Sequence, residues 1–308
     1  PKPDEHLVTE SSLSLDEQKN FLNISISAAL ERQKPKPDLV IVVGDVNSTV
    51  AGAEAGHELG IKVAHVEAGL RSFDKTMPEE VNRILTDRIS DYLFCPTDTA
   101  IKNLKKEGYE HIDCSIINCG DVMQDAANFY ATKSADKSSV FKSLNVQNFI
   151  LCTLHRAENT DNKSRLVSIV NALNEVNKTI PVIMPIHPRT KNKIIEQGID
   201  LNFKAIPPVG YFDMIELLKN CRLVMTDSGG LQKEAFFFKK NCITLRDQTE
   251  WVELVENKVN VLVGADYEKI ISAVNISFNQ KTSFDINLYG NGKACQNITN
   301  YLLEEFNK

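Results

Sequence analysis

Short apolar runs alternate with longer segments of helical periodicity along most of this chain. From residue 38 onward the pattern predicts strands at 38–43, 61–66, 92–95 and 114–119. Segments compatible with helices lie between them, at 48–59, 79–90 and 97–107. Strands that alternate with helices in this way build a mostly parallel sheet with both faces covered. The first half of the chain therefore predicts an α/β fold.

Residues 134–148 are polar and poor in strand-forming residues, which favours a linker or domain boundary. The alternation then restarts, with strands predicted at 149–155, 181–187, 222–226, 242–246 and 259–263. Helices are predicted at 163–178, 190–197, 211–219, 229–238, 249–256, 266–277 and, as an amphipathic segment, 293–308. We therefore expect two Rossmann-like domains, 1–147 and 148–292, with 293–308 joining the first. Ligands of such sheets bind beyond the carboxyl ends of the strands, so we expect an active site in a cleft.

Composition narrows the functional classes. A length of 308 residues suits two domains, and a net charge of −6 argues against a broad nucleic-acid surface. We see no apolar run of membrane-spanning length and no signal peptide, and we expect a cytoplasmic protein. The seven cysteines are scattered without a Cys-x-x-Cys pair. They predict free thiols in a reducing cytosol rather than disulfides or a zinc site.

The segment Thr226–Glu234 follows an apolar strand and reads Thr-Asp-Ser-Gly-Gly-Leu-Gln-Lys-Glu. Glycines at a strand–turn–helix junction let backbone N–H groups approach an anion, and the helix N-terminus favours negative charge. Ser228, Gly229 and Gly230 would then hold a diphosphate, and Glu234, one turn deeper, would lie near a ribose diol. An ordinary turn capped by Asp227 or Ser228 explains the segment equally well.

Ionisable residues also follow the strands of the first half. Asp45 comes after strand 38–43, and a helix N-cap is its ordinary alternative role. Glu67 ends the next strand and needs a partner or a function; an ion pair with Arg71 is the structural alternative. Glu79 and Glu80 open a helix after a proline, where the helix dipole alone is a sufficient reason for acidic residues.

Cationic residues follow the strands of the second half. His155 and Arg156 end strand 149–155 and form a natural anion clamp. His187 ends the next strand and repeats the theme, and Arg246 ends strand 242–246. The histidines are not at metal-ligand spacing, so we predict no metal site.

Taken in order, these segments resemble the non-hydrolysing UDP-N-acetylglucosamine 2-epimerase family. The matching segments are Gly-Asp-Val-Asn-Ser-Thr (44–49), His-Val-Glu-Ala-Gly-Leu-Arg (65–71), Pro-Glu-Glu-Val-Asn-Arg (78–83), His-Arg-Ala-Glu-Asn (155–159), Asp-Ser-Gly-Gly-Leu-Gln-Lys-Glu (227–234) and Tyr-Gly-Asn-Gly-Lys-Ala (289–294). The resemblance implies a glycosyltransferase-B-like pair of Rossmann-like domains. Segment 246–254 carries Thr-Glu-Trp where the commoner form has Thr-Glu-Arg-Pro-Glu. This form resembles enzymes that act on UDP-2,3-diacetamido-2,3-dideoxyglucuronic acid.

The resemblance also implies a reaction and its residues. The family inverts C2 of a UDP-linked acetamido sugar, from gluco to manno, by eliminating UDP and adding it back, for surface-polysaccharide assembly. It requires no cofactor. The acid and base groups would be Asp45, Glu67 and Glu79, with His155 at the diphosphate and the uracil near Pro208–Tyr211. We expect the substrate to be bound by Arg71, Arg83, Arg156, His187, Tyr211, Ser228, Gly229, Gly230, Glu234 and Arg246.

The family opens with an apolar strand ending in Gly-Thr-Arg-Pro-Glu, which this sequence does not show. The first βα unit is apparently missing, and a molecule without it would have one strand fewer and weak activity or none. Three alternatives stay open: a hydrolysing epimerase that releases N-acetylmannosamine and UDP, a glycosyltransferase, and an inactive nucleotide-sugar binding protein. A homodimer is the expected assembly on base rates.

Overall fold

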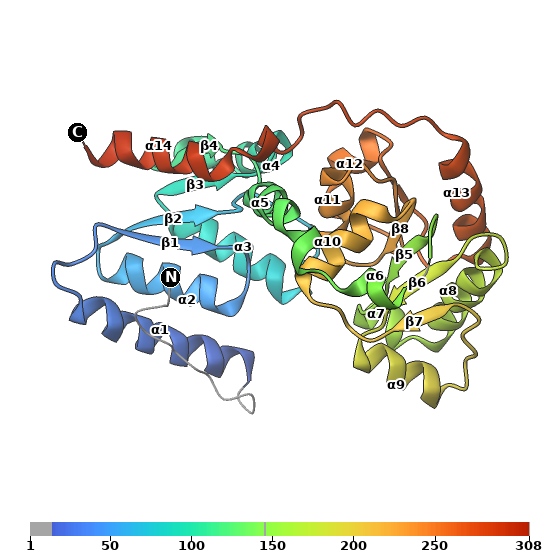
Figure 1. Ribbon diagram of the computed structural model, residues 1–308. Helices are drawn as coiled ribbons and strands as arrows, with labels where there is room; N and C mark the ends of the chain where they lie inside the picture. Colours follow the sequence, from blue (N-terminus) through green and yellow to red (C-terminus); the bar gives the residue numbers. More distant parts are fainter. Residues whose placement is uncertain (1–13, 145, 308) are drawn as a thin grey trace. The chain divides into compact units, whose positions relative to one another are not determined.

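Figure 1 shows the computed structural model, which describes residues 14–144 and 146–307. The chain divides into two compact units. Unit 1 runs to Val122 and includes Asn287 onward, and unit 2 is Met123–Ile286. In the described part of the chain, no helix has both the length and the apolar character needed to cross a membrane.

Unit 1 is a parallel sheet with helices on both faces. Among the described residues its strands lie in the order β1 (Leu39–Val43), β2 (Lys62–Val66), β3 (Tyr92–Cys95) and β4 (Ser115–Asn118). One face packs against α2 (Asn47–Glu58) and α3 (Pro78–Ile89), and the opposite face against α14 (Ala294–Phe306). Helix α1 (Leu15–Arg32) covers α2, and α4 (Asp98–Lys106) precedes β4. Short 3-10 turns occupy Tyr109–His111 and Gly290–Gly292.

Unit 2 has a second parallel sheet. Among the described residues its order is β10 (Asn260–Leu262), β9 (Cys242–Thr244), β8 (Leu223–Thr226), β5 (Ile150–Thr153), β6 (Val182–Pro185) and β7 (Lys204–Ile206). The strand order reverses at β5, which pairs with both β6 and β8. Such a reversal is the point where open α/β sheets bind ligands, just outside the carboxyl ends of the two strands.

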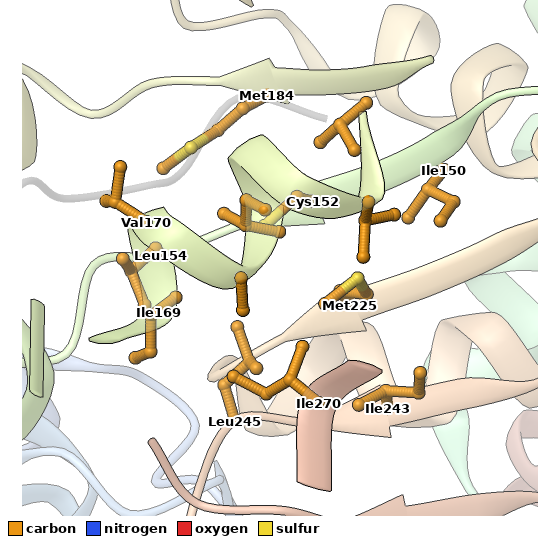
Figure 2. Packing of buried hydrophobic residues seen from close by; sticks show 14 of the residues in the cluster. Ile150, Cys152, Leu154, Ile169, Val170, Met184, Met225, Ile243, Leu245 and Ile270 are labelled. Atoms are coloured by element: carbon orange, nitrogen blue, oxygen red, sulfur yellow. The ribbon is translucent and has the colours of Figure 1, made fainter. Parts of the chain in front are cut away.

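The helices of unit 2 pack around this sheet. They are α5 (Val122–Lys137), α6 (Val140–Ser143), α7 (Ala157–Thr160), α8 (Lys163–Val176), α9 (Pro188–Glu196), α10 (Tyr211–Asn220), α11 (Gly229–Phe237), α12 (Val252–Glu256) and α13 (Tyr267–Asn279). Figure 2 shows apolar side chains of α8 and α13 meeting those of β5, β8 and β9, among them Ile169, Ile270, Ile150, Met225 and Ile243. This core fixes the strand ends that carry the site.

The predicted pair of Rossmann-like domains is confirmed, but the segment between them differs from the prediction. The polar stretch 134–148 holds the end of α5 and all of α6, and the structure divides after Val122 rather than after residue 147. The cause is polar pairing with α10: Ser134 Oγ lies 2.6 Å from Glu216 Oε1, and Ser138 Oγ lies 2.7 Å from Asp213 Oδ1. Side chains that looked solvated in the sequence are bonded to a neighbouring helix. The second division, after Ile286, also differs from the predicted 292.

Five elements were not predicted from the sequence: α1, α5, α6, α7 and the short strand β7. Strand β1 is the edge strand of the described sheet, and its Ile41 and Val43 are 51% and 54% exposed. The sequence predicts that no strand precedes β1. This prediction concerns residues 1–13 in part, and they lie outside the described residues.

Candidate functional site

The turns after β1 and β2 carry two of the predicted catalytic carboxylates. Val43 and Val66 are register partners at the ends of these strands, so Asp45 and Glu67 emerge at the same edge of the sheet. A Cβ placed on Gly44 would lie 3.8 Å from Glu67 Oε2, which puts this carboxylate against the turn that bears Asp45. The two acidic residues therefore belong to one site.

Glu67 also has an unusual backbone. Its φ is 77°, in the left-handed region that residues with a Cβ rarely adopt. Such a conformation costs about 1–3 kcal/mol and is found most often where function demands a fixed side-chain direction. This backbone conformation distinguishes Glu67 from the other acidic residues of unit 1 that the structure describes.

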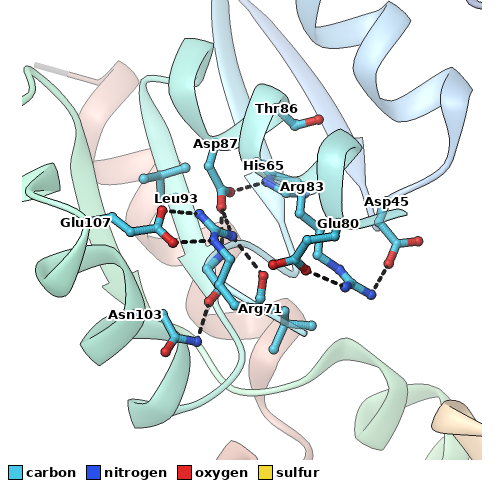
Figure 3. Close-up of polar contacts among 12 residues, drawn as sticks. Asp45, His65, Arg71, Glu80, Arg83, Thr86, Asp87, Leu93, Asn103 and Glu107 are labelled. Carbon is cyan, nitrogen blue, oxygen red and sulfur yellow. Dashed lines mark hydrogen bonds and ion pairs between the residues drawn. The ribbon is translucent and has the colours of Figure 1, made fainter. Parts of the chain in front are cut away.

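Asp45 is held by a cation instead of capping a helix. The N-cap of α2 is Val46, without a side-chain bond, so the N-cap alternative for Asp45 is wrong. Arg83 Nη2 donates to Asp45 Oδ2 at 2.6 Å (Figure 3). Asn82 Nδ2 donates to the Asp45 carbonyl at 2.9 Å. In the described structure Arg83 therefore holds the Asp45 carboxylate in place. Its role in binding substrate stays a prediction.

The neighbouring glutamates of α3 have different surroundings. Glu80 is buried, and it accepts the backbone N–H groups of Ser72 at 2.8 Å and Phe73 at 3.0 Å and a bond from Arg83 at 3.1 Å. It fixes the loop before α3. Glu79 is exposed on the first turn of the helix. Its carboxylate is open to a ligand, as a proton-transfer group must be.

Arg71 does not form the ion pair with Glu67 that was the structural alternative for that carboxylate. It is 4% exposed, and its guanidinium donates to Asp87 Oδ2 at 2.7 Å and to both Glu107 oxygens at 2.8 and 2.9 Å. Burial opposes its charge, but Glu107 and Asp87 hold the pKa of Arg71 above its ordinary value. The structure therefore gives Arg71 a structural role and does not support contact with substrate.

Helix α3 turns its polar face inward. Glu80, Arg83, Thr86 and Asp87 are buried, whereas Val81 and Leu85 are 41% and 38% exposed. This reverses the usual amphipathic arrangement. Sequence reasoning missed Asp87 and its partner His65. A histidine inside the apolar strand Lys62–Val66 was the signal that could have found the pair.

In unit 2, Asp227 organises the turn that bears the predicted anion clamp. The carboxylate is fully buried and accepts the backbone N–H groups of His155 at 3.1 Å and Arg156 at 2.9 Å, and Asn159 Nδ2 at 3.2 Å. His155 Nδ1 lies 3.3 Å from Asp227 Oδ1, while its side chain stays 47% exposed. Asp227 therefore orients the His155 ring through Nδ1, and the rest of the ring is exposed at the carboxyl ends of β5 and β8.

The glycine turn, residues 228–230, is compatible with both alternatives raised by the sequence, a capped helix and an anion site. Ser228 is the N-cap of α11, and its Oγ accepts from Leu231 N at 3.4 Å. This cap uses one of the first N–H groups of the helix, and those of Gly229 and Gly230 have no acceptor within it. A Cβ on Gly229 would collide with Oε1 of Glu250, so a larger residue there would require the Glu250 side chain to move. The capped turn is thus also a site that an anion can occupy.

A cavity of about 320 Å³ joins these residues within unit 2. Its lining includes His155, His187, Pro208, Val209, Ser228, Gly230 and Glu234. Nδ1 of His187 accepts from Arg189 N at 3.2 Å, so its Nε2 carries the proton in the neutral ring. The volume and the few polar groups are those of a small-molecule site.

Glu234 lines this cavity, and Tyr211 lies next to it. The Tyr211 hydroxyl donates to the Glu234 carboxylate. Burial raises the pKa of Glu234 above its ordinary value, against smaller opposing effects of Tyr211 and Lys233. Burial and the charge of Glu234 likewise raise the pKa of Tyr211. The carboxylate is thus poorly hydrated and gains from a ligand that supplies hydroxyl donors.

Arg246 contacts the glycine turn indirectly, through Glu250. It is 3% exposed, and its Nη1 donates to Glu250 Oε2 at 2.9 Å. Burial alone would raise the pKa of Glu250, but the charges of Arg246 and Arg156 hold it below its ordinary value. Because Glu250 lies against Gly229, Arg246 shapes the turn, and its guanidinium is not open to a ligand. The fully buried Lys233, 4.1 Å from the Trp251 ring, was also missed from the sequence.

Residues 14–144 and 146–307 include no cluster of three or more side chains able to hold a metal ion.

Similar proteins identify the family. A model of the UDP-N-acetylglucosamine 2-epimerase family matches residues 1–303. The chain is 54% identical over 270 residues to UDP-2,3-diacetamido-2,3-dideoxy-D-glucuronate 2-epimerase of Pseudomonas aeruginosa, covering 87% of this chain and 75% of that protein. It is 46% identical over 281 residues to UDP-N-acetylglucosamine 2-epimerase of Methanocaldococcus jannaschii, covering 87% and 76%. The chain thus spans about three quarters of the length of these relatives.

A solved structure agrees. The crystal structure of the Methanocaldococcus jannaschii UDP-GlcNAc 2-epimerase in complex with UDP-GlcNAc and UDP superposes with a TM-score of 0.83 at 44% identity. The match covers 95% of this chain and 82% of that one. The chain therefore belongs to the UDP-N-acetylglucosamine 2-epimerase family.

Proposed function

We propose that this protein inverts C2 of a UDP-linked 2-acetamido sugar, from the gluco to the manno configuration, without hydrolysing it. The observation that carries the proposal is that Asp45 and Glu67 emerge at the same edge of the sheet, where the left-handed backbone of Glu67 directs its carboxylate at the turn after β1. Carboxylates that move a proton on and off a carbon atom are what such an inversion needs.

The chemistry follows from the weak acidity of the C2 proton. As the C1–O bond breaks, its electron pair leaves with UDP, and a carboxylate removes the C2 proton. The electron pair of the C2–H bond becomes a C1=C2 double bond, giving a 2-acetamidoglycal. UDP then adds back to C1 while a proton reaches C2 on the other face. Opposite faces require more than one acid or base, which Asp45, Glu67 and Glu79 supply.

Unit 2 would hold the UDP part. Negative charge on the diphosphate grows as the C1–O bond breaks, and donors placed in advance stabilise it. His155, Arg156 and the N–H groups of Gly229 and Gly230 are such donors, with His187 at the same cavity. Glu234 would accept the ribose hydroxyls, and uracil would lie by Pro208–Tyr211. These roles are supported by the buried carboxylate of Asp227, which fixes the clamp.

The proposed sugar is UDP-2,3-diacetamido-2,3-dideoxyglucuronic acid. Support comes from the 54% identity to the Pseudomonas aeruginosa enzyme of that name and from the Thr-Glu-Trp form of residues 249–251. A role in surface-polysaccharide assembly follows from this substrate. A homodimer stays a prediction, as does a place in the cytoplasm, in keeping with seven free thiols.

Incubation in D2O with UDP-GlcNAc and, separately, with the diacetamido-uronate tests both activity and substrate. We expect deuterium at C2 and the manno epimer, still UDP-linked, with the uronate turning over faster. Nuclear magnetic resonance (NMR) of C2 and of the phosphorus atoms follows both. Free N-acetylmannosamine with UDP would instead show a hydrolysing enzyme, and tight UDP binding without deuterium uptake from either sugar would show a binding protein.

Glu234→Gln is expected to weaken UDP binding by about tenfold or more, because it removes a charged acceptor of the ribose hydroxyls. The UDP-free protein should melt about 1–2 °C higher at about pH 7. The pKa of Glu234 is raised on folding, so the ionised group costs stability above its unfolded-state pKa. Below about pH 4 both states bind the proton, and the difference should vanish.

Calorimetric titration with UDP and thermal melts at both pH values measure these effects. Glu256→Gln, at an exposed position near the end of α12, is the matched control and should change neither quantity. Unchanged UDP affinity in Glu234→Gln would remove Glu234 from the proposed site.

A further inference from the structure

A network of four charged side chains, three of them buried, lies beneath the Asp45 and Glu67 turns. It consists of His65 from β2, Asp87 from α3, Arg71 and Glu107, as Figure 3 shows. His65 and Asp87 are fully buried, and the proposed reaction uses neither directly. Buried charges are rare unless they are paired and functional, so their placement asks for a reason.

Both ring nitrogens of His65 face acceptors. Nδ1 lies 2.7 Å from Asp87 Oδ1, and Nε2 lies 2.8 Å from the carbonyl oxygen of Gly44. A carbonyl can only accept, so Nε2 carries a proton. Nδ1 carries one as well if Asp87 is ionised, because an ionised carboxylate has no proton to give.

Asp87 is ionised on the evidence of its other bonds. Its Oδ2 accepts from Arg71 Nη1 at 2.7 Å and from the Gly69 backbone N–H at 3.2 Å. The strands beside His65 present Val42 and Leu93 at its level, so the charge bonded to its ring comes from α3.

Charge balance agrees with this assignment. With His65 doubly protonated, two cations meet the two anions Asp87 and Glu107, and the network is neutral. With a neutral ring, the buried carboxylate of Asp87 would share the single positive charge of Arg71 with Glu107, whose side chain is 30% exposed.

The network touches the backbone of both catalytic turns. His65 holds the carbonyl of Gly44, the residue before Asp45, and Asp87 holds the N–H of Gly69, two residues after Glu67. Gly69 has φ 77°, and its added Cβ would lie 2.6 Å from the Ala100 carbonyl oxygen, so this turn is closely packed. Displacing either bond would shift the carboxylate next to it.

We infer that His65 and Asp87 are positioning residues: a buried imidazolium–carboxylate pair that holds the two turns so that Asp45 and Glu67 stay at the reacting carbon. The inference rests on the proposed function. It adds a reason for a charged histidine in the interior of a strand. It also explains why α3 buries its polar face.

The protonation state is tested on the unmodified protein. In protein labelled with ¹⁵N-histidine, at the pH of the activity assay, both ring nitrogens of His65 should resonate in the protonated range, because both face acceptors. The resonance is assigned by its loss in His65→Gln. An unprotonated His65 nitrogen at that pH would overturn the inference.

The positioning role is tested by kinetics. His65→Gln should lower kcat by about 10²-fold, the effect expected of a carboxylate displaced by about 1 Å. KM and the affinity for UDP should stay within about threefold of the unmodified enzyme. His57→Gln, at an exposed position in α2, is the matched control and should leave kcat unchanged. An unchanged kcat in His65→Gln, or an equal loss of kcat and UDP affinity, would overturn the role.

A failure of the proposed function would be recognised separately. It would appear as no deuterium uptake by the unmodified enzyme with either sugar. Backbone amide resonances would then decide the positioning role. In Asp87→Asn, those of Asp45, Glu67 and Gly69 should move while those of Ser228 and Gly229 stay. Unmoved resonances at the first three would overturn it.

Discussion

Glu67→Gln is expected to lower turnover of the UDP-sugar by about 10³-fold, the range of a lost general acid or base. Glutamine has the shape of glutamate but cannot accept the C2 proton. Uptake of deuterium at C2 should fall by the same factor, because the missing step is proton transfer. UDP affinity should change little, since the proposed UDP-binding residues belong to unit 2. The measurements are initial rates in D2O by NMR and calorimetric titration with UDP.

Glu58→Gln is the matched control, because Glu58 is exposed at the end of α2 and carries the same change of charge. Its rates should equal those of the unmodified enzyme. Near-normal epimerisation by Glu67→Gln with a normal melting temperature would exclude Glu67 as an acid or base. The remaining candidates would then be Asp45 and Glu79.

The second large effect is expected for Asp227→Asn. The buried carboxylate accepts two backbone N–H groups and the amide of Asn159. Asparagine has one side-chain oxygen that can accept these bonds. Its NH₂ group would face N–H donors, which cannot accept a bond from it. We therefore expect a loss of about 2–4 kcal/mol in the free energy of unfolding of unit 2. UDP affinity should fall by tenfold or more, because the turn that bears His155 and Arg156 is no longer fixed.

Urea unfolding followed by circular dichroism, together with UDP titration below the unfolding midpoint, tests both parts. Asp161→Asn serves as the control: Asp161 is 46% exposed in its pair with Arg189, and exposed pairs contribute little. Unaltered stability in Asp227→Asn would contradict the assigned role of the carboxylate. A loss of stability with unaltered UDP affinity would show that His155 and Arg156 do not bind UDP.

The strand ends were predictable because parallel strands present their carboxyl ends at one edge. The apolar runs before Asp45, Glu67, His155 and Asp227 are short, rich in β-branched residues and ended by polar or glycine residues. These signals are local, and the register of β1 with β2 and of β5 with β8 follows from the fold class. The family and the two Rossmann-like units were predicted from them and are confirmed.

The ion pairs and hydrogen bonds that hold these residues in place were not predictable, because they join residues far apart in the chain. An ion pair of Arg71 with Glu67, four residues away, was the structural alternative, but Arg71 pairs with Glu107 from the end of α4. Asp87 lies in a helix whose pattern suggests an exposed polar face, yet that face is buried. In α5, Ser134 reads as part of a solvated linker until Glu216 of α10 is placed beside it. Pair contacts of this kind need the tertiary structure.

The left-handed backbone of Glu67 has a consequence for how this protein can change. Glycine adopts that conformation without a steric penalty, and asparagine tolerates it better than glutamate does. Selection or redesign guided by thermal stability alone would therefore favour replacing this glutamate. At residue 67 folding and reactivity make opposite demands, so stabilising variants of this enzyme have to be sought elsewhere in the chain.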